Sequence, residues 1–161
     1  MPRAVVNHTT LRAAHHEPET MPIELEYETF GDPKAPPLLL IMGLGAQMIA
    51  WEDDFCKCLA GRGRFVIRYD NRDVGRSTRL HGQRTPPLGD LLARAAAGEI
   101  VDDVPYLLRD LAGDAIGLLD SLSLGSAHVV GLSMGGMIAQ EMAIRWPRRL
   151  RSLTSIMSTT S

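Results

Sequence analysis

The sequence contains few cysteines and no long apolar run. Cys56 and Cys58 are its only cysteines. Their spacing within a predicted helix points the two side chains in different directions, which disfavours a mutual disulfide, and no further cysteines are present to complete a metal or redox site. The first twenty residues lack the apolar core of a secretory signal, and no later run has the length of a membrane span. We therefore expect a cytoplasmic location and no membrane span.

Basic residues are also sparse and scattered. Lys34 and Lys57 are the only lysines, and the formal net charge is −2. Without a long basic run there is no electrostatic basis for binding nucleic acid or an anionic membrane surface. The adjacent His15 and His16 are interpreted as solvated side chains rather than metal ligands, and no cofactor or metal is expected.

The composition is that of an ordinary globular domain. Hydrophobic residues make up 45% and charged residues 22% of the 161 positions, enough apolar side chains to bury a core. Residues 1–20 show no clear period and are predicted to form a polar tail outside the folded core, so that the domain spans 21–161. No repeat or low-complexity segment interrupts it.

Strands and helices alternate along this domain. Apolar runs and period-2 stretches predict strands, while apolar stripes of helical period, a proline start and glycine or proline stops predict helices. Strands are predicted at 23–30, 38–43, 64–70, 127–132 and 150–158, and helices at 50–63, 88–98, 105–122 and 134–146. This order is typical of an α/β fold with a mostly parallel sheet covered by helices on both faces.

The stretch "GLSMG" places Ser133 between Gly131 and Gly135, where the strand 127–132 gives way to the helix 134–146. In a G-x-S-x-G turn the serine adopts strained backbone angles that lift its hydroxyl clear of the sheet, and the two glycines avoid collisions with neighbouring backbone. Ser133 is therefore predicted to be a nucleophile. The alternative is a serine that only caps a glycine-rich helix start.

A nucleophilic serine of this kind needs donors for an oxyanion. The Met134 N–H at the helix start is one candidate donor, favoured by the helix dipole. The second is expected in "GLGA" after the strand 38–43, with the Leu44 N–H as first candidate and Gly43 as its rival. The alternative is that this stretch is a plain turn.

Three motifs in order, "LLLIMGLG", "RYDNRDVGRS" and "GLSMGG", resemble the N-terminal half of an α/β-hydrolase. The similarity is to the bacterial esterase and lipase group that includes the aclacinomycin methylesterase-like proteins. It implies an α/β-hydrolase core truncated after the strand that follows the nucleophile helix. Met42 stands where many relatives have histidine, and Asp73 where they have glycine. Asp70, Arg72 and Asp73 are expected to hold turns together rather than to act in catalysis.

In this architecture the triad follows the chain order serine, acid, histidine. After Ser133 the sequence has no histidine, and Glu141 in the following helix is its only acid. His128 precedes Ser133 by nearly a whole strand, and His81 would break the family's order. We expect the acid and the base to lie in sequence that this chain does not contain, and the chain alone to be inactive.

The resulting hypothesis is a serine carboxylic-ester hydrolase that acts on a small-molecule ester or acyl substrate through an acyl-enzyme on Ser133. Peptidase, thioesterase and lactonase chemistry use the same turn, so the fold does not choose the substrate. Methionines near the motifs favour an apolar acyl group unless they are core filler; they are Met42, Met48, Met134 and Met137. The rival is a non-catalytic scaffold for binding or assembly, with self-association through the exposed edge of the strand 150–158.

Overall fold

The apolar runs of the sequence become neighbouring strands of one sheet. The computed structural model describes residues 1–11, 19–82, 86–99, 101 and 103–159. Its strands are β1 (Arg3–Leu11), β2 (Glu19–Phe30), β3 (Pro37–Ile41), β4 (Phe65–Tyr69), β5 (Ala127–Leu132) and β6 (Leu150–Ile156). Its helices are α1 (Asp53–Gly61), α2 (Leu88–Ala96), α3 (Leu108–Ser121) and α4 (Met134–Arg145), with short 3-10 turns at Met48–Ala50 and Pro147–Arg149.

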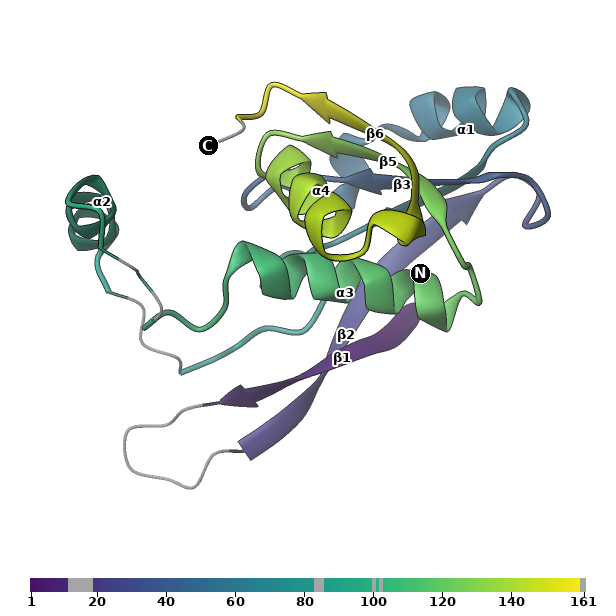
Figure 1. Cartoon of the computed structure of the whole chain (residues 1–161). Helices are drawn as coiled ribbons and strands as arrows, with labels where there is room; N and C mark the ends of the chain where they lie inside the picture. Colours follow the sequence, from purple (N-terminus) through teal and green to yellow (C-terminus); the bar gives the residue numbers. More distant parts are fainter. Residues whose placement is uncertain (12–18, 83–85, 100, 102, 160–161) are drawn as a thin grey trace.

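The six strands lie in the order β1-β2-β4-β3-β5-β6 (Figure 1). The four strands β4, β3, β5 and β6 run parallel to one another, while β2 pairs antiparallel with β4 and β1 antiparallel with β2. The predicted α/β fold with a mostly parallel sheet is confirmed. Because the carboxyl ends of parallel strands meet at one edge, the segments that follow β3, β4 and β5 are brought together there.

The N-terminal residues form a strand, so the prediction that 1–20 is a tail outside the fold is wrong. β1 pairs with β2 from Arg3 opposite Glu26 to Leu11 opposite Glu19. A contact between residues far apart in the sequence explains why this segment forms a strand although its local pattern is weak. A Cβ atom on Gly117 of α3 would overlap the carbonyl oxygen of Val6, so β1 can pack closely against α3 because this position is glycine. The predicted solvated pair His15 and His16 lies outside the described residues.

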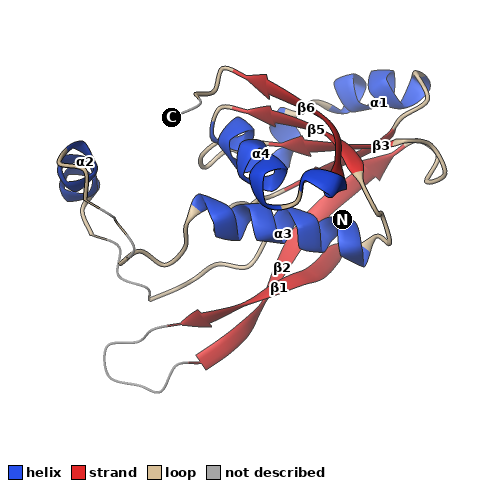
Figure 2. Cartoon of the chain, viewed as in Figure 1, coloured by secondary structure: helices blue, strands red, loops and turns tan. Residues whose placement is uncertain are grey.

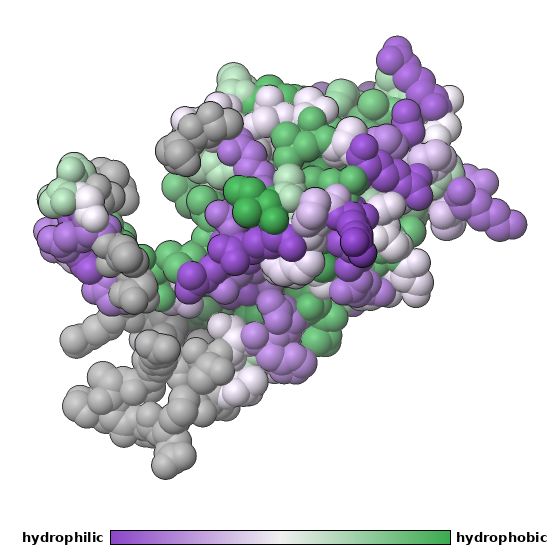
Figure 3. All heavy atoms as spheres, in the orientation of Figure 1, coloured by the Kyte–Doolittle hydropathy of each residue, from purple (hydrophilic) through white to green (hydrophobic). Residues whose placement is uncertain are grey.

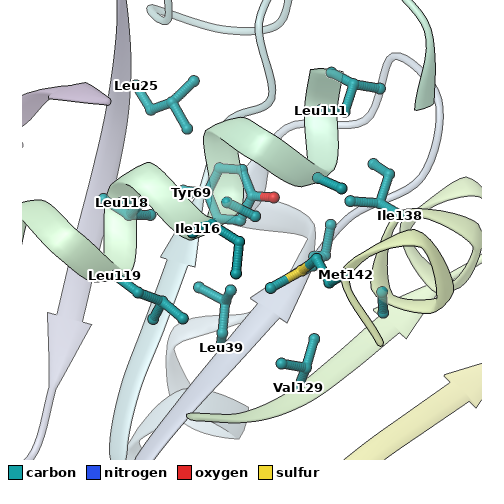
Figure 4. Close-up of a cluster of buried hydrophobic side chains, with 14 of the residues drawn as sticks. Leu25, Leu39, Tyr69, Leu111, Ile116, Leu118, Leu119, Val129, Ile138 and Met142 are labelled. Atoms are coloured by element: carbon teal, nitrogen blue, oxygen red, sulfur yellow. The ribbon is translucent and has the colours of Figure 1, made fainter. Parts of the chain in front are cut away.

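Helices cover both faces of the sheet, as predicted (Figure 2). Side chains of a strand alternate between faces, and on β3 Leu39 and Ile41 join a core with α3 and α4, while Leu38 and Leu40 join a second core with Trp51 and Cys56. Figure 4 shows part of the first core, in which leucines of α3 surround the ring of Tyr69. Every residue of β3 and β4 is buried, and this packing fixes the sheet edge from which the site projects.

Two helices begin later than the sequence predicts. α3 begins at Leu108 rather than at 105, because the carboxyl group of Asp110 accepts the Leu107 N–H at 2.7 Å and stabilises the start there. α1 begins at Asp53 rather than at 50, after the 3-10 turn. The buried guanidinium of Arg68 holds that start by donating to Asp53 at 2.6 Å.

The strand β6 forms one edge of the sheet, and all its residues after Leu150 are exposed. At the left of the view, α2 stands away from the sheet (Figure 1). Polar and apolar residues are interspersed on the face that carries α3 and α4 (Figure 3). In the described part of the chain, none of the helices combines the length and the apolar character needed to cross a membrane.

Candidate active site

Ser133 lies at a sharp turn between β5 and α4. Its backbone angles are φ 56° and ψ −122°, and residues other than glycine rarely adopt such a positive φ. Two hydrogen bonds of 2.9 Å hold the turn: the Ser133 N–H donates to the Ile156 carbonyl, and the Ser133 carbonyl accepts the Gly136 N–H. The residue is exposed, so the neighbouring β6 and α4 hold a strained serine at the surface.

The glycines on either side of Ser133 lie where no side chain fits. A Cβ atom on Gly131 would overlap the carbonyl of Gly135, and one on Gly135 would overlap the carbonyl of Ile41 and lie 2.9 Å from that of Met42. The turn thus packs backbone against backbone, with β5 and α4 touching each other and the end of β3. This is the crowding that the G-x-S-x-G spacing predicts.

The segment after β3 passes directly over Ser133. A Cβ atom on Gly43 would lie 3.1 Å from the Cβ of Ser133 and 3.5 Å from its Oγ. The next two residues form the tip of a turn in which the Ala46 N–H donates to the Gly43 carbonyl at 3.3 Å. At this tip the Leu44 side chain is 83% exposed.

The predicted oxyanion donors are the backbone N–H groups of Leu44, on the loop after β3, and of Met134, at the start of α4. Met134 is the first residue of α4, where helix N–H groups have no partner within the helix. Within the part of the chain that the structure describes, neither the Leu44 nor the Met134 N–H donates to another residue. Gly43 thus lies against Ser133, and the N–H groups of Leu44, which follows Gly43, and of Met134, which follows Ser133, have no partner among the described residues.

The charged residues of the middle motif hold turns, as expected. The carboxyl of Asp70 accepts the Met48 N–H at 2.6 Å. Arg72 forms a buried ion pair with Asp114, in which the guanidinium donates two hydrogen bonds of 2.6 Å to the carboxyl group. Asp73 has φ 64° and its carboxyl accepts the Leu80 N–H at 2.7 Å. Because aspartate is among the residues that tolerate a left-handed conformation, Asp73 takes the place of the usual glycine.

Sequence reasoning missed Asn71. This side chain is buried at 2% exposure, and its amide nitrogen donates to the Met42 carbonyl at 3.2 Å. Met42 immediately precedes Gly43, so Asn71 contacts the start of the loop that passes over Ser133. Its position beside Asp70 in the middle motif was the available signal.

None of the described histidines hydrogen-bonds the side chain of Ser133. His128 lies at the start of β5, at the opposite end of that strand, and its Nδ1 is 2.8 Å from the Oγ of Ser152. Burial lowers the pKa of His128, and the charges of Arg64 and Arg151 add to this effect. His81 lies in an exposed turn. None of the described residues hydrogen-bonds the Ser133 side chain, and no group of three His, Cys, Asp or Glu among them is placed to hold a metal ion.

Comparison with known proteins agrees with this geometry. The family model described as "alpha/beta hydrolase fold" matches residues 36–161. Rhodomycin D methylesterase DauP of Streptomyces sp. (strain C5) is 40% identical over 136 residues, which cover 82% of this chain and 38% of that protein. 3-Oxoadipate enol-lactonase 2 of Acinetobacter baylyi is 31% identical over 131 residues, 81% of this chain and 40% of that protein. The chain thus spans about two fifths of the length of these curated relatives.

Solved structures show the same likeness. The crystal structure of a hydrolase from Pseudomonas aeruginosa PA01 superposes with a TM-score of 0.62 at 29% identity, covering 91% of this chain and 44% of that one. The enol-lactonase from Burkholderia xenovorans LB400 gives a TM-score of 0.63 at 28% identity, covering 81% and 42%. The resemblance to bacterial esterases drawn from the three motifs is confirmed, and this chain belongs to the α/β-hydrolase family.

Proposed function

We propose that this chain carries the nucleophile of a serine carboxylic-ester hydrolase. The Oγ of Ser133 attacks the acyl carbon as a base takes its proton, and the amides of Met134 and Leu44 bind the oxyanion. The bond between the acyl carbon and the alcohol oxygen then breaks, and the alcohol leaves with that proton. Water hydrolyses the acyl-enzyme, which releases the acid and restores the serine hydroxyl. The observation that supports this most is the conformation of Ser133, exposed at φ 56° beneath Gly43. A strained residue persists only where its surroundings enforce it, and such residues cluster at active sites.

The base of this reaction lies, in our proposal, outside the 161 residues. Ser133 has no histidine partner among the described residues, and the sequence after it offers neither a histidine nor an acid beyond Glu141. A serine hydroxyl is a weak nucleophile without a base. The chain alone is therefore a fragment with at most residual activity, and a downstream segment supplies the acid and the histidine. A cytoplasmic location remains a prediction from the sequence.

The substrate class that we propose is a small ester or acyl compound. The relatives named as methylesterase and enol-lactonase act, by those names, on a methyl ester and an enol lactone, and the same serine chemistry serves both bonds. Two of the methionines that favoured an apolar acyl group are core filler, because Met42 is 6% and Met48 2% exposed. Met134 and Met137 are half-buried and remain the methionines available to contact an acyl group.

The rival function is a non-catalytic scaffold that associates through its sheet edge. The edge strand β6 and the residue after it expose apolar side chains, with Leu153 36%, Ile156 37% and Met157 81% exposed. Unpaired backbone groups beside such side chains form a template for further pairing. On this basis we expect the isolated chain to self-associate. The scaffold function is an alternative to the hydrolase proposal only if the chain has no downstream partner.

Complementation tests the proposal. The downstream half of the protein is supplied as a second polypeptide, and hydrolysis of a p-nitrophenyl ester is followed. We expect activity on mixing, none with Ser133→Ala, and a smaller associated species by size-exclusion chromatography once β6 is covered. A monodisperse chain of 161 residues that hydrolyses the ester alone, and loses activity with His81→Ala, would place the base within this chain and contradict us.

A further inference from the structure

Two consecutive residues after β4 contact both ends of the loop that passes over Ser133. Asn71 donates to the carbonyl of Met42, at the start of the loop, at 3.2 Å. Asp70 accepts the N–H of Met48, at its end, at 2.6 Å. Both contacts are buried. The turn at Leu44 lies between these two hydrogen bonds, so its amide is carried on a segment fixed at each end.

The support for this pair is itself rigid. The Asp70 N–H donates to the Glu26 carbonyl at 3.0 Å, and the Asp70 carbonyl accepts the Ser77 hydroxyl at 2.6 Å. Gly75, at φ 53°, leaves the room that the carboxyl group occupies, because a Cβ atom there would overlap Asp70 Oδ2. The sheet and the following turn thus hold the backbone of Asp70, and the Arg76 N–H donates to its second carboxyl oxygen at 3.4 Å.

We propose that Asp70 and Asn71 are positioning residues that fix the segment Met42–Met48, and with it the Leu44 amide, against Ser133. The inference rests on the proposed function, since it concerns the oxyanion donor of that reaction. An oxyanion donor acts well only when it is already oriented before the charge develops. Without these contacts, the loop from Met42 to Met48, with its exposed tip, would sample many conformations. The hydrogen bond at each end of the loop removes part of that conformational freedom.

The matched variants separate positioning from general stability. Asp70→Ala and Asn71→Ala each remove one end contact of the loop. Asp70→Asn keeps an oxygen that can accept the Met48 N–H and serves as the conservative rescue. Thr78→Val is the structural control, because the Thr78 hydroxyl accepts the Glu24 N–H at 2.8 Å on the same turn without contacting the loop.

The functional measurement is phosphonylation of Ser133 by a fluorophosphonate in the hydrolase that includes the downstream segment. We expect Asp70→Ala to lower the limiting rate constant about tenfold, less than the loss of an oxyanion donor itself, with the half-saturating concentration changed under about threefold. Asp70→Asn should recover most of the rate, and Thr78→Val should label at the wild-type rate despite a lower melting temperature. A folded Asp70→Ala that labels at the wild-type rate would overturn the inference while leaving the proposed function standing.

A second readout covers the remaining outcomes. Amide hydrogen exchange in the 161-residue chain should accelerate at the hydrogen-bonded N–H groups of the loop, those of Ala46 and Met48, in Asn71→Ala and not in Thr78→Val. Unchanged exchange there overturns the inference whatever the labelling shows, and Asn71→Ala decides the matter if Asp70→Ala does not fold. Absence of any label on wild-type Ser133 contradicts the proposed function instead.

Discussion

The backbone of Gly135 lies directly against the carbonyl of Ile41, closer than any side chain allows. A Cβ atom on Gly135 would overlap that oxygen and lie 2.9 Å from the carbonyl oxygen of Met42. The first turn of α4 therefore packs directly against the end of β3. This contact places Ser133 beneath Gly43. The stability of the turn and the position of Ser133 depend on the same contact.

We expect Gly135→Val to destabilise the protein far more than Ser133→Ala. The branched side chain has no space without moving β3 or α4, and overpacking of this kind costs about 1–3 kcal/mol or more. Ser133→Ala removes only an exposed hydroxyl that makes no hydrogen bond with the described residues. Thermal unfolding of both variants checks this, and equal melting temperatures would contradict the packing described.

Replacing the strained serine with glycine should stabilise the protein. Ser133 holds φ 56° and ψ −122°, angles that glycine adopts without steric cost. Because a residue in a sparsely populated region costs about 1–3 kcal/mol, we expect Ser133→Gly to unfold at a higher temperature than Ser133→Ala. An equal or lower melting temperature for the glycine variant would show that the turn stores no such strain.

The stability of the fold should fall below about pH 6.5 through His128. Burial, with Arg64 and Arg151 nearby, lowers the pKa of this histidine from 6.5. The unfolded chain then binds the proton more tightly than the folded one, so this part of the stability is present above the unfolded pKa of about 6.5 and is lost as the pH falls below it. Over this fall in pH, melting temperatures should decrease less for His128→Gln than for the wild type. Parallel pH profiles would exclude this histidine as the cause.

The two thiols should react at different rates. Cys58 is exposed, while Cys56 is buried and its Sγ donates to the Trp51 carbonyl at 3.6 Å. Burial also raises the pKa of Cys56, and the thiolate is the reactive form. Iodoacetamide should therefore modify Cys58 in the native protein and both residues only after denaturation. Rapid native labelling of Cys56 would show that α1 does not pack as described.

The elements with a strong local signal could be predicted from the sequence. β5 occupies 127–132 as expected, because the short apolar run after His128 leads directly into the glycines of the serine motif. β1 could not be predicted, since its close packing against α3 depends on the bare backbone of Gly117, more than a hundred residues away. The role of Asn71 was missed for the same kind of reason: its partner Met42 lies 29 residues earlier and is reached only when β3 and β4 pair.

Ser133 is, in our proposal, the nucleophile of a hydrolase whose base lies outside these 161 residues. Fluorophosphonate labelling with mapping of the modified residue by mass spectrometry tests it most directly, with and without the downstream segment. We expect the label on Ser133 when that segment is present, and little or none on the chain alone. A label on Ser77 or Ser155 with Ser133 unmodified would contradict the claim.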